Sequence, residues 1–373
     1  MPTILVNPNR AEPKVPRRAG LGGDGPRPFH RRLPGYAPTP LAEAPGGAAD
    51  LGLARLWVKD ESSRLGLPAF KILGASWAIY RLVVERLGHE PQWRDLDELR
   101  AALASLGPLR FVAATDGNHG RAVAHTASLL GYESHILVPA GTAAARIAGI
   151  ESEGAAVTVV DGTYDDAVVA SAEMASSTTL VVSDTSWPGY TDVPANVIAG
   201  YDTIFAEVDD QLAGSQPDIV VVQMGVGALA AAVVAHYEGR SAIVGVEPDT
   251  AACNLASAAA GRPVTVPGPH RSIMAGLNCG NVSMIAWPLV SRGVDVFVAI
   301  DDAAAEQAMR DLAGIGMVAG ETGASGLAGL GALAAAPPGS HPLELAGASV
   351  LVLCTEGATD PEAYERIVSR VAK

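Results

Sequence analysis

The sequence has few cysteines, no long apolar run and no excess of basic residues, and each absence excludes a class of protein. Its three cysteines, at positions 253, 279 and 354, are too few and too scattered for a disulfide framework or a zinc site. The formal net charge is −14, which argues against a nucleic-acid partner. No apolar run reaches the length of a membrane span, and MPTILVNPNR lacks the charge-then-apolar order of a signal peptide. We therefore expect a cytoplasmic protein with no metal site, no membrane association and no nucleic-acid partner.

The composition suits a large folded core. Of the 373 residues, 49% are hydrophobic and only 18% are charged, and the chain is long enough for two domains. The first forty residues differ, because they hold nine of the 26 prolines and seven basic residues against two acidic ones. A segment of this kind is most often an extended strap that lies on its own protein.

From residue 55 onwards, short runs rich in β-branched residues alternate with helical stretches. Apolar runs bounded by Gly, Pro or Asp are typical of parallel strands that are buried on both faces. The runs are RLWVKDE, RFVAAT, SHILVP, AVTVV, TLVVSD, DIVVVQMG, AIVGVEP, DVFVAI and SVLVLCT. The alternation predicts an α/β fold of two domains with mostly parallel sheets flanked by helices and a cleft between them. We assign residues 1–40 to an N-terminal arm, 41–88 and 190–373 to a large domain, and 89–189 to a small domain.

A lysine stands in an apolar stretch, GLPAFKILGASWAIY, at the predicted first turn of a helix. A lysine is costly to bury unless it is paired or chemically used. Its neighbours Phe70, Ile72 and Leu73 favour the uncharged amine, which is the reactive form. The alternative is that Lys71 extends its ammonium along the surface to solvent.

Polar residues follow several of the predicted strands. In AATDGNHGRAVA, Asp116 lies at a strand end, Gly117 turns the chain and Asn118 is predicted to cap the next helix. Asp184 and Thr355 follow later strands in the same way. Because parallel strands place their carboxyl ends at one edge, where α/β proteins hold ligands, we expect these side chains to line a site.

DIVVVQMGVGALAAAV predicts a strand, a glycine turn and a helix whose N-terminal amides can bind a phosphate. The turn also fits the dinucleotide-binding pattern G-x-G-x-x-A through Gly225, Gly227 and Ala230, with Glu247 at the end of the next strand. The sequence pattern leaves open a third interpretation, in which small residues only let the helix pack closely on its strand.

The order of these motifs resembles the pyridoxal-phosphate enzymes of the tryptophan-synthase-β fold, known as fold type II. Within that group the chain looks like the diaminopropionate ammonia-lyase branch, over residues 30–373. The resemblance is carried by KDESSRLGLPAFKILGAS, ATDGNHGRAVA, SDTSWPGY, QMGVGAL, IMAGLNCG, GETGASG and CTEGATDPEAY. The Pro-rich arm and the Ala-rich stretch AARIAGIESEG depart from the family pattern.

The resemblance implies that pyridoxal phosphate lies in the cleft, with its phosphate on the amides of the glycine turn. The implied cofactor-binding residues are Phe70, Lys71, Asn118, Gly225, Val226, Gly227, Ala228 and Thr355. In this assignment Lys71 forms a Schiff base with the cofactor and later acts as acid and base. Asn118 bonds the phenolic oxygen of the cofactor, and Thr355 faces the pyridine nitrogen.

The resemblance makes Lys71, Asp116 and Asp184 the catalytic residues, with the two carboxylates beside the substrate's amino group and β-carbon. Most fold type II enzymes carry Ser where this chain has Asp116. A carboxylate there can pair with an extra substrate ammonium or protonate a leaving ammonia. The implied reaction is therefore α,β-elimination of ammonia from 2,3-diaminopropionate, giving pyruvate and ammonia, in a homodimer.

Three alternatives stay open. A related enzyme could eliminate or replace the β-group of serine, threonine or another β-substituted amino acid. An NAD-dependent oxidoreductase would use the glycine turn and Glu247, but it leaves Lys71, Asn118 and Thr355 without a role. In the third alternative, the protein is a sensor that keeps the fold of a pyridoxal-phosphate enzyme but catalyses no reaction. The resemblance also raises a Cys253–Cys279 disulfide, although two reduced thiols suit the cytoplasm better.

Overall fold

The computed structural model describes residues 2–11, 25–115 and 117–369, which form two compact units. Of these residues, unit 1 contains 2–11, 38–63 and 204–369, and unit 2 contains 25–37, 64–115 and 117–203. Both units are layered α/β structures, which confirms the predicted fold class. The predicted large domain included residues 64–88 and 190–203, whereas both stretches belong to unit 2, in which the helix Lys71–Leu87 packs against the helix Asp192–Gly200. The predicted domain boundaries otherwise remain a prediction.

Unit 1 is built on a seven-stranded sheet in the order β1-β10-β9-β8-β11-β3-β2. Its strands are β1 (Thr3–Val6), β2 (Leu41–Glu43), β3 (Arg55–Asp60), β8 (Ile219–Gln223), β9 (Ala242–Pro248), β10 (Val296–Ile300) and β11 (Ser349–Cys354). The five inner strands run parallel, and β1 and β2 are antiparallel edges. Every residue of β8 and of β10 is buried, as the uninterrupted apolar runs predicted.

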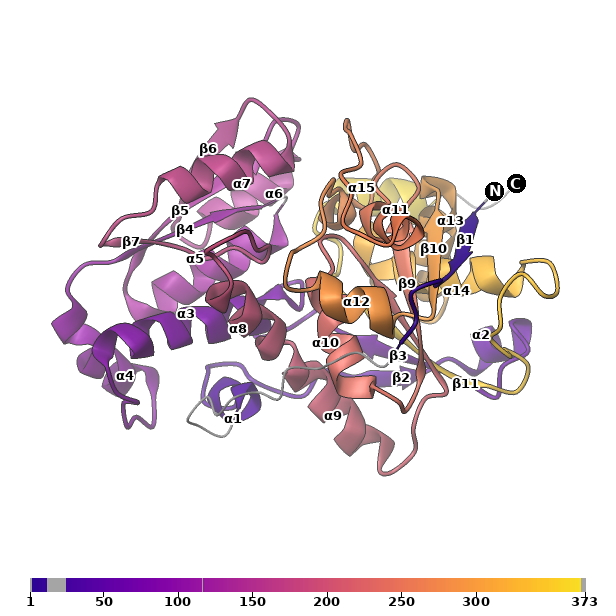
Figure 1. Ribbon diagram of the computed structural model, residues 1–373. Coiled ribbons are helices and arrows are strands. Elements are labelled where there is room, and N and C mark those ends of the chain that lie inside the picture. The colour runs from indigo at the N-terminus through magenta and orange to yellow at the C-terminus, as the bar shows by residue number, and fades with distance from the viewer. Residues whose placement is uncertain (1, 12–24, 116, 370–373) are drawn as a thin grey trace. The chain divides into compact units, whose positions relative to one another are not determined.

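Helices cover the sheet of unit 1 on both faces. They are α2 (Pro45–Asp50), α9 (Asp202–Leu212, whose first two residues belong to unit 2), α10 (Ala228–Tyr237), α11 (Cys253–Ala260), α12 (Trp287–Gly293), α13 (Asp302–Gly314), α14 (Glu321–Ala334) and α15 (Pro361–Val368), with a short 3₁₀ turn, η2 (Ala275–Leu277). The segment β1, from the Pro-rich arm, lies beside β10, far from it in sequence (Figure 1). Of the rest of the arm, residues 12–24 lie outside the described residues.

Unit 2 is built on a parallel four-stranded sheet in the order β6-β5-β4-β7. Its strands are β4 (Arg110–Ala114), β5 (Glu133–Pro139), β6 (Ala156–Val160) and β7 (Thr179–Val181). Its helices are α1 (Pro26–His30), α3 (Lys71–Leu87), α4 (Leu96–Leu103), α5 (Asn118–Leu130), α6 (Ala144–Glu151), α7 (Tyr164–Glu173) and α8 (Asp192–Gly200), with the 3₁₀ turn η1 (Ala104–Leu106).

Helix α3 crosses α8 at two glycines that allow very close contact. A Cβ atom at Gly74 would lie 2.6 Å from the ring of Tyr201, and one at Gly200 would lie 2.4 Å from the carbonyl oxygen of Leu73. Both distances are too short for any other residue. The first turn of α3 is therefore held rigidly by its own unit.

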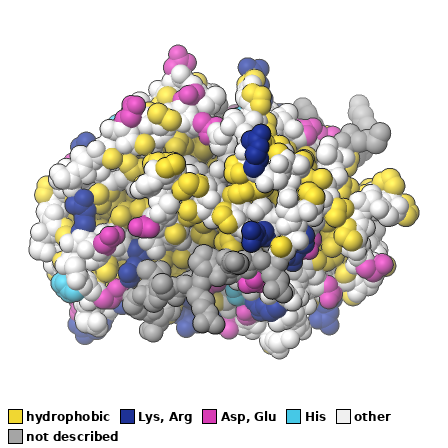
Figure 2. Space-filling model, viewed as in Figure 1, with side chains coloured by type: hydrophobic (Ala, Val, Ile, Leu, Met, Phe, Trp, Pro, Cys, Tyr) yellow, Lys and Arg dark blue, Asp and Glu magenta, His cyan; other side chains and the backbone are white. Residues whose placement is uncertain are grey.

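Among the described residues, no helix is long and apolar enough to cross a membrane. On the face shown in Figure 2, Lys and Arg side chains are scattered among Asp, Glu and apolar side chains, and they form no continuous basic surface there.

Candidate active site

Lys71 is the first residue of α3, and its ammonium is paired. Its Nζ donates a hydrogen bond to Oδ2 of Asp184 over 2.6 Å, with 20% of the Lys71 side chain exposed and 7% of the Asp184 side chain. The ring of Phe70, which is buried, lies 5.5 Å from the same Nζ. The apolar surroundings predicted from the sequence are thus only partly present, because a carboxylate 113 residues away faces the amine.

Asp184 follows β7 and is held as a carboxylate. The hydroxyl of Tyr164, at the start of α7, donates to its Oδ1 over 3.1 Å. Burial by itself raises the pKa of Asp184, but the Lys71 ammonium and the hydrogen bonds from Lys71 and Tyr164 outweigh it and hold the pKa well below its usual range. The carboxylate therefore stays ionised at neutral pH and can hold a cationic nitrogen.

His119 adds a neutral imidazole to this group. It is buried, and its Nε2 lies 2.8 Å from the carbonyl oxygen of Val182, so Nε2 carries the proton and donates it. Burial lowers the pKa of His119, although nearby Asp184 raises it and Lys71 lowers it further. We call Lys71, His119, Tyr164 and Asp184 the lysine cluster.

Few other lysines could carry out amine chemistry. The chain has only four, at positions 14, 59, 71 and 373, and the first and last lie outside the described residues. Lys59 is fully buried, with its Nζ bonded to Glu207 at 2.9 Å and to the carbonyl oxygen of Thr39 at 2.8 Å. Of the two described lysines, Lys71 alone is accessible.

The turn before α5 differs from the prediction by one residue. The helix begins at Asn118, and Gly117, at φ +150°, takes the N-cap position without a side-chain cap. The prediction that Asn118 caps the helix is therefore wrong, because only glycine adopts this backbone angle readily. The half-buried Asn118 starts the helix instead. Asp116 lies outside the described residues.

In unit 1, the glycine turn between β8 and α10 presents backbone amides at a helix start. Gly227 caps α10 at φ +95°, and within the described residues no side-chain cap bonds the amides there. A Cβ atom at Gly225 would lie 3.0 Å from the carbonyl oxygen of Gly276. Helix N-terminal amides that no described side chain satisfies are well suited to an anion such as a phosphate. We call residues 225–228 the phosphate loop.

The carbonyl side of the phosphate loop is tied to its neighbours. The Nδ2 of Asn254 donates to the carbonyl oxygen of Gly225 over 2.8 Å, and the amide of Ser283 donates to that of Val226 over 2.8 Å. Cys253 also approaches Gly225 O, at 3.7 Å, and the structure holds Cys253 and Cys279 as buried thiols rather than a disulfide. These hydrogen bonds hold the loop in its shape from the carbonyl side.

Glu247 supports this loop and has no surface open to a ribose. It is fully buried, and it accepts hydrogen bonds from the amides of Asn254 and Leu255 over 2.7 and 2.8 Å. Burial raises the pKa of Glu247 to about 7, against those hydrogen bonds. The dinucleotide pattern therefore arises here from a helix cap, which removes the residue on which the NAD-dependent alternative relied.

Thr355 lies at the carboxyl end of β11, the strand next to β8. It is 2% exposed, and its Oγ1 accepts a hydrogen bond from Nε2 of Gln223 over 2.9 Å. Gln223 directly precedes the turn that leads into the phosphate loop. The ends of two adjacent strands thus bring a hydroxyl and an anion-binding turn to the same edge of the sheet.

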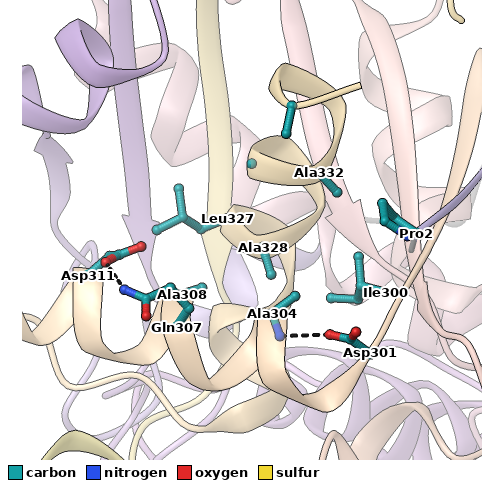
Figure 3. A pocket seen from close by; sticks show the side chains of 12 residues that line it. Pro2, Ile300, Asp301, Ala304, Gln307, Ala308, Asp311, Leu327, Ala328 and Ala332 are labelled. Atoms are coloured by element: carbon teal, nitrogen blue, oxygen red, sulfur yellow. Dashed lines mark hydrogen bonds between the residues drawn. The ribbon is translucent and has the colours of Figure 1, made fainter. Parts of the chain in front are cut away.

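A separate hollow in unit 1 has different chemistry (Figure 3). It encloses about 290 Å³ between α13 and α14, and its lining is mostly Ala, Leu and Ile. Its carboxylates are used by the fold, since Asp301 caps α13 and Asp311 accepts a hydrogen bond from Gln307. The lining has no nucleophile and no set of metal ligands.

A model of the family described as pyridoxal-phosphate dependent enzymes matches residues 32–355. The chain belongs to this family. It is 36% identical over 371 residues to the diaminopropionate ammonia-lyase of Salmonella typhimurium, covering 91% of this chain and 90% of that protein. It is also similar to the crystal structure of the Escherichia coli diaminopropionate ammonia-lyase in complex with D-serine, with a TM-score of 0.89 and 33% identity over 99% of this chain and 97% of that one. The same Escherichia coli enzyme in complex with an aminoacrylate-PLP azomethine reaction intermediate gives a TM-score of 0.86 at 33% identity, with coverage of 99% and 97%.

Family membership confirms the predicted enzyme class and its cofactor, pyridoxal phosphate. The residues present fit that group. The phosphate loop offers amides for the phosphate, the accessible Lys71 offers an amine for the aldehyde, and Thr355 offers a hydroxyl for the ring nitrogen. Each of these three matches involves a single unit: the phosphate loop and Thr355 belong to unit 1, and Lys71 belongs to unit 2.

The structure pairs some of the predicted site residues directly. Lys71 and Asp184 are bonded in unit 2, and Thr355 shares a sheet edge with the phosphate loop in unit 1. Three residues at these sites were missed from the sequence, namely His119, which directly follows Asn118, Tyr164 and Gln223. Tyr164 had no local signal, whereas Gln223 had one, as the polar end of an otherwise apolar strand.

Proposed function

We propose that this protein is a pyridoxal-phosphate dependent ammonia-lyase that removes ammonia from 2,3-diaminopropionate by α,β-elimination and yields pyruvate. The observation that carries the proposal is the 2.6 Å bond between the Lys71 amine and the Asp184 carboxylate. The relatives described above are diaminopropionate ammonia-lyases, which agrees with this reaction. When bound, pyridoxal phosphate supplies an electron-withdrawing ring conjugated to the substrate's α-carbon, which acidifies the proton there.

The chain's own residues supply the proton transfers. The Lys71 amine takes the proton from the substrate's α-carbon when it is uncharged. Asp184, which holds the Lys71 ammonium in this structure, can hold the β-ammonium of the substrate in the same way. Tyr164 orients that carboxylate through Oδ1. Serine and threonine have a hydroxyl at the β-carbon in place of the ammonium, so they gain less from a fixed carboxylate.

The remaining assignments carry over from the sequence. Asp116 is the second acid–base residue, beside the substrate's amino group and β-carbon. Asn118 bonds the phenolic oxygen of the cofactor, and Phe70 packs beside it. The phosphate loop binds the phosphate, and Thr355 faces the pyridine nitrogen.

We also assign the protein to the cytoplasm as a homodimer. Three buried thiols in the described residues support a reducing compartment, and the family resemblance supports the dimer. Light scattering of the purified enzyme after size-exclusion chromatography tests the dimer, and a mass of one chain would contradict it.

The function is tested by comparing pyruvate release from D- and L-2,3-diaminopropionate with keto-acid release from serine and threonine, with pyridoxal phosphate supplied. The proposal expects kcat/KM for diaminopropionate to exceed that for serine by at least about a hundredfold, because a charged partner discriminates strongly. Comparable or faster turnover of serine or threonine would make the protein a dehydratase instead.

A further inference from the structure

The side-chain amide of Gln223 donates hydrogen bonds through Nε2 and accepts none from the described residues. Its Nε2 lies 2.9 Å from the carbonyl oxygen of Thr322, 3.0 Å from that of Leu353 and 3.3 Å from that of Gly323. It also lies 2.9 Å from Oγ1 of Thr355. The reverse orientation of the amide would set an oxygen against three carbonyl oxygens, so the NH₂ group must face them. The three backbone carbonyl groups therefore fix which end of the Gln223 amide faces Thr355.

This orientation of the amide leaves its oxygen atom without a hydrogen bond. The Oε1 atom of Gln223 is buried and has no hydrogen-bond partner among the described residues. It faces Gly326 of α14, where an added Cβ atom would come within 3.2 Å of it. A buried acceptor without a partner destabilises the folded state, and an apolar side chain would avoid that cost. The residue is thus better explained by what its NH₂ group does than by packing.

The NH₂ group determines what Thr355 can do. A hydroxyl has one hydrogen and two acceptor sites. Since Oγ1 of Thr355 accepts a hydrogen from Gln223, one of its two acceptor sites is filled and its own hydrogen is left to be donated elsewhere, with no acceptor for it among the described residues. A hydroxyl held in this way offers a donor, and an unprotonated pyridine nitrogen is an acceptor that fits it.

We propose that Gln223 is a positioning residue that fixes the polarity of the Thr355 hydroxyl, so that the hydroxyl donates to the cofactor's ring nitrogen and keeps this nitrogen unprotonated. The inference rests on the proposed role of Thr355 opposite that nitrogen. Gln223 itself acts only through Thr355. A ring with an unprotonated nitrogen withdraws less electron density from the substrate's α-carbon. This weaker withdrawal suffices for β-elimination and disfavours transamination.

The substitution Gln223→Glu reverses the polarity. A carboxyl group has at most one hydrogen, for which three backbone carbonyls compete, so the hydrogen shared with Thr355 must come from Thr355. Its Oγ1 then turns a lone pair toward the ring nitrogen and favours the protonated ring. Gln223→Met removes the donor without adding an acid and should give an intermediate state.

The measurement is the ¹⁵N chemical shift of the ring nitrogen in holoenzyme loaded with ¹⁵N-labelled pyridoxal phosphate. Wild type, Gln223→Glu, Gln223→Met, Thr355→Val and the double variant Gln223→Glu/Thr355→Val are compared. The matched control is Gln211→Glu, another glutamine of unit 1, whose Nε2 donates to the carbonyl oxygen of Thr39 over 2.8 Å. We expect Gln223→Glu to move the resonance toward that of a protonated pyridine and the control to leave it in place.

The double-mutant cycle separates the outcomes. In the Thr355→Val background, Gln223→Glu should cause no further shift. An equal shift with and without Thr355 would overturn the inference, as would a shift for Thr355→Val but none for either Gln223 variant. If Thr355→Val itself causes no shift, Thr355 does not face the ring nitrogen, and the proposed role of Thr355 fails together with the inference. Should Gln223→Glu fail to fold, an unshifted resonance in Gln223→Met overturns it.

Discussion

Lys71 and Asp184 are 113 residues apart in the sequence, yet the amine of one donates to the carboxylate of the other over 2.6 Å. The pair unites the two groups that an ammonia-lyase needs, an amine that can exchange protons and an anion that can hold a substrate ammonium. Tyr164 fixes the second carboxylate oxygen. The lysine cluster is therefore ordered by unit 2 alone.

Replacing Asp184 by Asn should lower kcat/KM for diaminopropionate by about 10²–10⁴-fold, because the carboxylate is lost where charge must be held. Turnover of serine, if measurable, should fall much less. The matched control is Asp209→Asn, whose carboxylate lies at the surface and bonds His236. Equal losses for both substrates would show that Asp184 does not recognise the β-nitrogen.

The same substitution should change how stability depends on pH. The folded-state pKa of Asp184 lies below its unfolded value, so its contribution is complete above about pH 4 and is lost as the pH falls further. Chemical unfolding of the cofactor-free proteins should show that wild type loses more stability than Asp184→Asn between pH 5 and pH 2. Parallel curves for the two proteins would contradict the pairing.

Lys71→Ala should no longer retain pyridoxal phosphate covalently after borohydride reduction, and its activity should fall by roughly 10³-fold or more. Lys71→Arg, the control, keeps a cation for Asp184 but should also fail to retain the cofactor. Mass spectrometry of the reduced wild type should locate the cofactor on the peptide that contains Lys71. Labelling at Lys59 would contradict the account, and the complete burial of Lys59 makes that outcome unexpected.

Gly225→Val should weaken binding of pyridoxal phosphate by at least about tenfold. The added side chain meets Gly276 and Cys279 at 3.0 and 3.2 Å and must displace the phosphate loop. Gly331→Ala is the control, because this glycine of α14 has open space where the Cβ would go and should gain about 0.5–1 kcal/mol of stability. Equilibrium dialysis and thermal unfolding measure the two effects, and unchanged cofactor affinity in Gly225→Val would exclude the loop as the phosphate site.

Glu247 should produce a pH dependence of the opposite sign to that of Asp184. Its folded-state pKa of about 7 lies above the unfolded value, so its contribution is complete below about pH 4 and is lost as the pH rises through 7. Wild type should therefore lose on the order of 2–3 kcal/mol between pH 4.5 and pH 8. Glu247→Gln should not show that loss in urea unfolding, and an unchanged slope would mean that the buried carboxyl is ionised throughout.

Much of the fold was predictable because the strands of this chain are strongly patterned. The run DIVVVQMG became the fully buried strand β8, and Lys71 begins a helix as expected. Two local patterns were compatible with structures that the protein does not adopt. The G-x-G-x-x-A turn with Glu247 left a dinucleotide site open as an alternative, whereas Glu247 is buried and accepts hydrogen bonds from the first amides of α11. Asn118 was expected to cap α5, but Gly117 occupies the N-cap position.

The pairings within the site could not be read from local sequence. The bond between Lys71 and Asp184 depends on how α3 packs in unit 2, and the partners of Gln223 come from β11 and α14. Each contact joins segments about a hundred residues apart, and no periodicity or motif specifies the other end. Tyr164 illustrates the limit, since nothing around it in the sequence indicates a carboxylate partner.

The most direct test of the central claim is the amount of ammonia released for each pyruvate from 2,3-diaminopropionate labelled with ¹⁵N at the β-nitrogen. Elimination of the β-ammonium followed by hydrolysis at the α-carbon releases both nitrogens, so the account predicts about two ammonia molecules for each pyruvate, with the label entirely in the released ammonia. A product that keeps the β-nitrogen, with ammonia and keto acid formed in equal amounts, would contradict it.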